Sequence, residues 1–172
     1  MLIFLIGFMG SGKTTAGRML AESLRYSFAD LDQLIEEREG MPITEIFARK
    51  GEGYFRKAEA EVLDNLVGRE RLVVACGGGT ACFHDNMQKM KSAGLTLYLK
   101  VSPALLARRL ATQHSSRPLV AGMQGDRLKN HIRKLLSGRE GWYRQCDIIY
   151  DADNFDLQKV LDLITTFSGP EG

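Results

Sequence analysis

The sequence predicts a three-layer α/β fold, in which helices cover both faces of a parallel sheet. Short segments of strand length alternate along the chain with longer segments that have helical periodicity. The first strand-length segment is apolar throughout, as a strand buried on both faces should be. A glycine-rich turn then joins it to the first helix, and parallel α/β sheets bind ligands at this edge.

The first three predicted strands lie in the amino-terminal half of the chain. Leu2–Ile6 is apolar and ends at Gly7. Residues 26–29 form a second predicted strand that ends at Asp30, and residues 72–75 form a third that runs into three glycines. Each predicted strand therefore ends at residues that could line a ligand site.

The helices between these strands are predicted from periodicity. Apolar side chains recur on one face from residue 14 to about residue 25. Residues 31–67 are expected to form a helical lobe rather than a linker, and Gly40 and Pro42 end its first helix. The lobe helices are expected at 31–39, 44–50 and 54–67.

The carboxyl-terminal half continues the alternation, with one interruption. Ser102 and Pro103 are typical of a helix start after the fourth strand. Residues 112–125 have little periodicity and are long enough to suggest a function, so we predict a mobile lid there. The remaining elements are expected as strands at 95–99 and 147–150 and helices at about 126–143 and 156–167.

Length and composition favour one domain spanning residues 1–172. The chain contains 44% hydrophobic and 26% charged residues, which is ordinary globular usage. The formal net charge of +2 is too small to predict binding to nucleic acid or to an anionic membrane. Cys76, Cys82 and Cys146 lack metal-ligand spacing, and an odd, sparse set of cysteines fits a reducing cytosol.

The sequence Gly-Phe-Met-Gly-Ser-Gly-Lys-Thr at residues 7–14 matches the P-loop pattern between a predicted strand and a predicted helix. Its backbone N–H groups can surround phosphate oxygens at the helix N-terminus. We expect Lys13 to neutralise the β- and γ-phosphates and the Thr14 hydroxyl to bind Mg²⁺. The residues expected to contact ATP in this loop are Gly10, Ser11, Gly12, Lys13, Thr14 and Thr15.

A P-loop alone does not separate kinases from other nucleotide-binding proteins. The chain has neither the NKxD nor the DxxG motif of switch GTPases. Its 172 residues leave no room for a transporter ATPase with its signature helix. A small-molecule kinase therefore remains as the favoured class.

Further motifs resemble the shikimate kinase family. They are Asp30-Leu31-Asp32, Phe55-Arg56-Lys57-Ala58-Glu59, the three glycines 77–79, Arg117-Pro118-Leu119, Gly138-Arg139-Glu140 and Tyr143-Arg144. Their order and spacing match that family over almost the whole chain. The resemblance implies a parallel sheet of five strands in the order 2-3-1-4-5, with a substrate-binding helical lobe.

The same resemblance implies an activity. A member of this family phosphorylates shikimate to 3-phosphoshikimate with ATP, in the biosynthesis of aromatic amino acids. It would need Mg²⁺ as its only metal, and we expect it to be cytoplasmic and monomeric. Another small-metabolite kinase, for gluconate or a nucleotide, and a P-loop protein without catalytic activity are the alternatives.

The resemblance also implies a role for each matching residue near the transferred phosphate. Asp30 would hold Mg²⁺, through water. Asp32 would accept the hydrogen bond of the substrate hydroxyl, as a base or as an orienting group. Arg117 would close over the transferring phosphate and Arg109 would lie near adenine. Without the resemblance, two carboxylates at a helix start would be about as well explained as helix caps.

The acceptor itself would be bound by other matching residues. Arg56 and Arg139 would bind the shikimate carboxylate, and Gly78 and Gly79 would lie under its ring. Either arginine taken alone would more often be a solvated surface charge. The chain departs from the family at Ala75-Cys76, where a serine or threonine usually precedes the glycines, and the loop at 151–156 lacks an arginine that several relatives carry.

Overall fold

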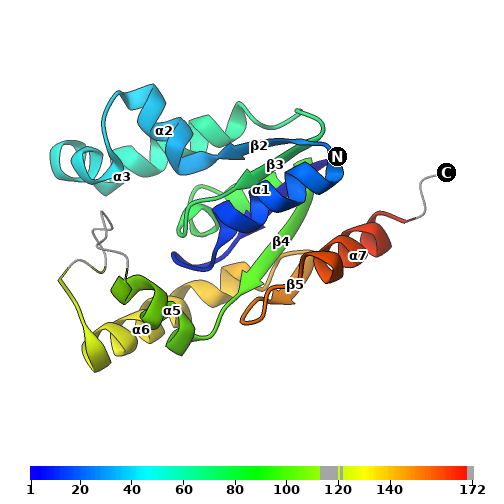
Figure 1. The fold of residues 1–172 in the computed structure, drawn as a ribbon. Coiled ribbons are helices and arrows are strands. Elements are labelled where there is room, and N and C mark those ends of the chain that lie inside the picture. The colour runs from blue at the N-terminus through cyan, green and yellow to red at the C-terminus, as the bar shows by residue number, and fades with distance from the viewer. Residues whose placement is uncertain (113–119, 121, 170–172) are drawn as a thin grey trace.

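The computed structural model describes residues 1–112, 120 and 122–169, which fold around a parallel sheet (Figure 1). Its strands are β1 (Leu2–Ile6), β2 (Ser27–Asp30), β3 (Leu72–Ala75), β4 (Leu95–Lys100) and β5 (Ile148–Asp151). They are all parallel and lie in the order β2-β3-β1-β4-β5. The predicted fold class and strand order are therefore confirmed.

Helices cover both faces of this sheet. They are α1 (Lys13–Leu24), α2 (Leu31–Glu39), α3 (Ile43–Asp64), α4 (Asn86–Ala93), α5 (Pro103–Thr112), α6 (Gly125–Tyr143) and α7 (Leu157–Ser168), with a short 3₁₀ helix, η1 (Thr80–Cys82). Connections between parallel strands are right-handed, so α1 and α4, which cross the sheet in opposite directions, cover opposite faces. Helix α7 packs beside α1 on the same face (Figure 1).

The core is centred on β1, which lies in the middle of the sheet. All five of its side chains are buried, as its apolar sequence predicts. Because β1 pairs with β3 and β4, the turn that follows it lies among the carboxyl ends of three strands. In Figure 1 the pairs α2–α3 and α5–α6 flank this end of the sheet from opposite sides.

The helical lobe contains one difference from the predicted boundaries. Helix α3 continues across residues 50–54 instead of separating into two helices, but Gly51 within it has non-helical angles of φ 80° and ψ 169°. A positive φ is readily adopted by glycine, so this residue bends the element where the sequence predicts a gap. The α3 helix then ends at Asp64, three residues before the predicted end.

Most of the predicted lid, residues 113–119 and 121, lies outside the described residues, and Arg117 lies there with it. Helix α5 leads into this segment and α6 follows it. In the described part of the chain, no helix has both the length and the apolar character needed to cross a membrane.

Candidate active site

The P-loop turn between β1 and α1 fixes the position of its own lysine. Gly10 and Gly12 adopt positive φ angles of 80° and 89°, which glycine reaches without strain. The Lys13 ammonium donates to the carbonyls of Gly7 and Phe8 at 2.8 and 2.9 Å. This charge is therefore held at the positive end of α1, where an anion would be bound.

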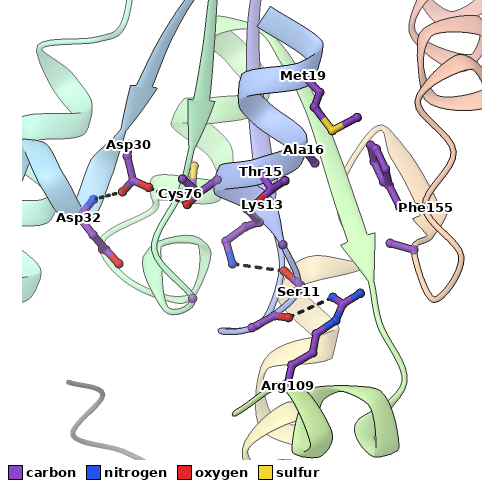
Figure 2. Close-up of a pocket in the computed structure, with 15 residues that line it drawn as sticks. Ser11, Lys13, Thr15, Ala16, Met19, Asp30, Asp32, Cys76, Arg109 and Phe155 are labelled. Carbon is purple, nitrogen blue, oxygen red and sulfur yellow. Dashed lines mark hydrogen bonds between the residues drawn. The ribbon is translucent and has the colours of Figure 1, made fainter. Parts of the chain in front are cut away.

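A cavity of about 420 Å³ lies over this turn (Figure 2). Every P-loop residue expected to contact ATP lines it, together with Asp30, Asp32 and Arg109. The Arg109 guanidinium donates to the Gly10 carbonyl at 3.1 Å, which fixes it beside the loop. Ala152 and Phe155 form a further part of the wall, and the sequence analysis did not identify either of them.

Asp30 makes two kinds of hydrogen bond, one with the start of α2 and one with the helix that follows the P-loop. Its Oδ1 accepts from the backbone N–H groups of Asp32 and Gln33, so it caps α2. Its Oδ2 accepts from the Thr14 hydroxyl at 2.7 Å. A carboxylate and a hydroxyl in contact are suitable for Mg²⁺, which takes few protein ligands and keeps much of its water.

A second cavity, of about 230 Å³, lies beside the first. Arg56, Arg139 and the three glycines line it, with an aromatic wall formed by Phe47 and Phe55. Two residues, Asp32 and Gly78, line both cavities. The structure therefore joins a phosphate-binding cavity to a smaller cavity that carries two guanidinium groups.

Comparisons with known proteins assign the chain that carries these two cavities to a family. The family model for shikimate kinase matches residues 9–167. The chain belongs to the shikimate kinase family. It is 42% identical over 154 residues to a shikimate kinase of Bacteroides fragilis, which covers 90% of this chain and 86% of that protein.

Solved structures of shikimate kinases agree with this assignment. The structure of shikimate kinase from Bacteroides thetaiotaomicron aligns with a TM-score of 0.90 at 37% identity, covering 95% of this chain and 97% of that one. The structure from Acinetobacter baumannii, a complex with shikimate, aligns with a TM-score of 0.85 at 37% identity and covers 95% and 92%.

In this member of the shikimate kinase family, Arg56 is buried rather than solvated. Only 5% of it is exposed, and its Nη1 donates to Glu59 at 2.9 Å. The guanidinium also lies over the Phe83 ring, 4.3 Å from its centroid. The surface-charge alternative is therefore wrong for Arg56. Glu59 has no role in the sequence analysis, although its spacing of three residues from Arg56 places both on one helix face.

Two of the glycines are required by close contacts in this site. A β-carbon at Gly77 would lie 2.7 Å from Oδ1 of Asp32. One at Gly79 would lie 2.5 Å from Nη2 of Arg56. Real β-carbons do not approach other atoms so closely, so larger residues here would displace the side chains of Asp32 and Arg56.

Cys76 stands directly before the three glycines, where the sequence analysis expects a departure from the family. Its thiol is buried and lies 3.6 Å from the sulfur of Met90. Burial raises the pKa of this thiol well above its usual range, so it stays protonated at neutral pH. The thiol is therefore paired with another sulfur atom, although the residue lines the larger cavity.

Every site residue predicted from the sequence lines one of the two cavities, apart from Arg117, which lies outside the described residues. The sequence analysis gave no role to Glu59, which contacts Arg56 and Thr80, or to Phe155, which lines the larger cavity. The roles of the predicted residues remain proposals.

Proposed function

We propose that phosphoryl transfer from ATP to shikimate takes place where the two cavities meet. The larger cavity, over the P-loop, would hold ATP, and the smaller one, with Arg56 and Arg139, would hold shikimate. The observation that supports this arrangement is that Asp32 and Gly78 line both cavities. The Asp32 carboxylate would therefore lie close both to the acceptor hydroxyl and to the γ-phosphate that this hydroxyl attacks.

The P-loop residues would bind the phosphates of ATP. Backbone N–H groups of Gly10, Ser11 and Gly12 supply hydrogen bonds, and Lys13 supplies positive charge beside them. Thr14 and Asp30 would hold Mg²⁺, which neutralises phosphate charge when it is bound. Thr15 and Arg109 complete the proposed contacts with the nucleotide, since both line the same cavity.

The smaller cavity would bind shikimate through its carboxylate. Planar guanidinium groups pair well with carboxylates, and Arg56 and Arg139 both line this cavity. Gly78 and Gly79 would lie under the ring, where the absence of side chains leaves space. The aromatic wall formed by Phe47 and Phe55 would cover the apolar part of the ring.

The transfer itself needs few chemical groups from the protein. The shikimate oxygen forms a bond to the γ-phosphorus while the bond from that phosphorus to the β,γ-bridging oxygen breaks, which gives 3-phosphoshikimate and ADP. The hydroxyl proton passes to Asp32, or Asp32 orients the hydroxyl until the proton leaves. Arg117 would reach the transferring phosphate from the lid, a contribution worth roughly 10³ to 10⁵ in rate in related enzymes.

We also propose that the enzyme acts as a monomer in the cytoplasm, with ATP and shikimate as its only partners. The small net charge gives no support for nucleic acid or membrane binding.

Measurement of ADP release with several acceptors in parallel tests this function. We expect rapid, Mg²⁺-dependent release with shikimate and only background release with gluconate or with nucleoside monophosphates. Faster release with either of those acceptors would replace shikimate by another small-metabolite substrate. ATP binding without release in any mixture would indicate a P-loop protein without catalytic activity.

A further inference from the structure

The carbonyl of Gly78 accepts hydrogen bonds from two side chains of α6. Arg139 donates through Nη1 at 3.3 Å, and the Tyr143 hydroxyl donates to the same oxygen. Residues four apart lie on one face of a helix, so a single turn of α6 supplies both donors. Arg139 has a proposed role in binding the acceptor, whereas Tyr143 has none so far.

The surroundings of Tyr143 hold its hydroxyl in place to donate to the Gly78 carbonyl. Its side chain is fully buried, and its ring packs against that of Tyr98 with the centroids 5.1 Å apart. Burial raises the pKa of Tyr143, so the phenol keeps its proton at neutral pH and can act as a donor. The packed ring therefore presents the hydroxyl to Gly78 in one orientation.

This bond determines where the next amide points. The carbonyl of Gly78 and the N–H of Gly79 belong to one planar trans peptide, in which they face opposite directions. Because the carbonyl is directed at α6, the N–H is directed away from that helix. Among the described residues, no oxygen accepts a hydrogen bond from this N–H. Gly79 lines the smaller cavity, with Arg56 against its α-carbon.

We infer that Tyr143 is a positioning residue for the acceptor, which fixes the Gly78 carbonyl so that the N–H of Gly79 donates to an oxygen of the bound acid. The inference rests on the proposed function of the smaller cavity. Tyr143 also keeps Arg139 in register with the glycine turn, because both side chains are attached to the same carbonyl. The amide of Gly79 and the guanidinium of Arg139 are thus placed as one unit.

Replacing Tyr143 by phenylalanine removes the hydroxyl and keeps the ring. We expect Tyr143→Phe to raise the KM for shikimate about three- to tenfold, the value of one hydrogen bond, with the KM for ATP unchanged. Tyr98→Phe is the matched control, since its ring packs on Tyr143 but its residue lines a different pocket with Glu140 and Arg144. Tyr98→Phe should keep the wild-type KM for both substrates.

A lowered melting temperature together with a wild-type KM for shikimate in Tyr143→Phe would overturn the inference, because it would show a purely structural role. Should wild-type enzyme release no ADP with shikimate, the proposed function fails, and the inference falls with it. If wild-type enzyme turns over shikimate and both variants behave alike, the inference alone fails.

A measurement on the wild-type chain keeps the inference testable if Tyr143→Phe does not fold. In protein labelled with ¹⁵N-glycine, shikimate should shift the amide resonance of Gly79 and slow its exchange with solvent. In a folded Tyr143→Phe protein, both changes should be smaller at equal saturation. A Gly79 amide that does not respond to saturating shikimate in wild-type enzyme would overturn the inference.

Discussion

The guanidinium of Arg56 donates to the carboxylate of Glu59 at 2.9 Å, and both side chains are almost removed from water, with 6% and 0% exposed. Burying two charges costs free energy unless their remaining hydrogen-bonding groups are satisfied. The second oxygen of Glu59 accepts from the Thr80 hydroxyl at 2.6 Å. Arg56 is therefore held in a fixed orientation at the wall of the smaller cavity, where its guanidinium could pair with a carboxylate.

Replacing Glu59 by glutamine should remove the buried negative charge beside Arg56 and leave only the half-exposed Glu52 to balance it. We expect the free energy of unfolding to fall by about 3 to 5 kcal/mol and the KM for shikimate to rise. Denaturant unfolding and steady-state kinetics would measure the two effects. Glu52→Gln is the control, since Glu52 contacts the same arginine but is 53% exposed and should change stability by less than about 1 kcal/mol. Equal losses in both variants would contradict the special position of Glu59.

Asp30→Asn separates the capping role of this residue from its proposed metal role. Asparagine caps a helix about as well as aspartate, so the free energy of unfolding should change by less than about 1 kcal/mol. The loss of charge should raise the Mg²⁺ concentration for half-maximal activity by about ten- to a hundredfold. Magnesium titration of ADP release would measure this shift.

The chain offers a matched control for this experiment in Asp156, which caps α7 with the same pair of backbone hydrogen bonds. Asp156→Asn should leave the magnesium requirement at the wild-type value. A shift of equal size in both variants would mean that the effect arises from helix capping and not from metal binding.

Cys76→Ala tests the position where the chain departs from its family. Because the thiol contacts Met90 and is uncharged, we expect kcat to stay within about twofold of wild type, or about 0.4 kcal/mol in the barrier. Loss of the buried sulfur should lower the free energy of unfolding by about 1 kcal/mol. A fall in kcat of tenfold or more would assign the thiol a contact with bound nucleotide that the structure does not contain.

The sequence carries local signals for the fold and for much of the site. The P-loop, the apolar strands and Asp30 at the end of β2 are each defined by neighbouring residues, and their predictions are confirmed as positions in the structure. The surroundings of Arg56 include the Phe83 ring and, through Glu59, the Thr80 hydroxyl, and both of these residues follow β3 in the chain. A single sequence contains no signal for such contacts.

Asp30 is a second residue whose contacts cannot be predicted from the sequence alone. Its sequence context fits a helix cap and a metal ligand, and the two are not exclusive, because one carboxylate oxygen caps α2 while the other accepts from the Thr14 hydroxyl and could also approach a cation. The contact with Thr14, which lies on α1, is not visible in the sequence around Asp30.

Arg139 allows a cleaner test of carboxylate binding than Arg56 does, because the two arginines have different surroundings. Arg56→Ala would strand Glu59 in the interior, so lost stability would accompany any loss of binding. Arg139→Ala removes a half-buried side chain that contacts Gly78 and lies 5.6 Å from the Phe8 ring centroid, and it leaves no buried carboxylate behind. We expect it to raise the KM for shikimate by roughly ten- to a hundredfold, since a charge-assisted hydrogen bond is worth about 1.5 to 3 kcal/mol, while ATP binding barely changes.

Two controls determine whether this loss reflects carboxylate binding. Arg133→Ala removes an exposed arginine from the same helix and should have wild-type kinetics. The alcohol that corresponds to shikimate has no carboxylate, so wild-type enzyme should use it poorly, and Arg139→Ala should use it about as poorly as wild type does. If wild-type enzyme phosphorylates the alcohol as efficiently as shikimate, the carboxylate is not recognised, and the two guanidinium groups in the smaller cavity must serve another purpose.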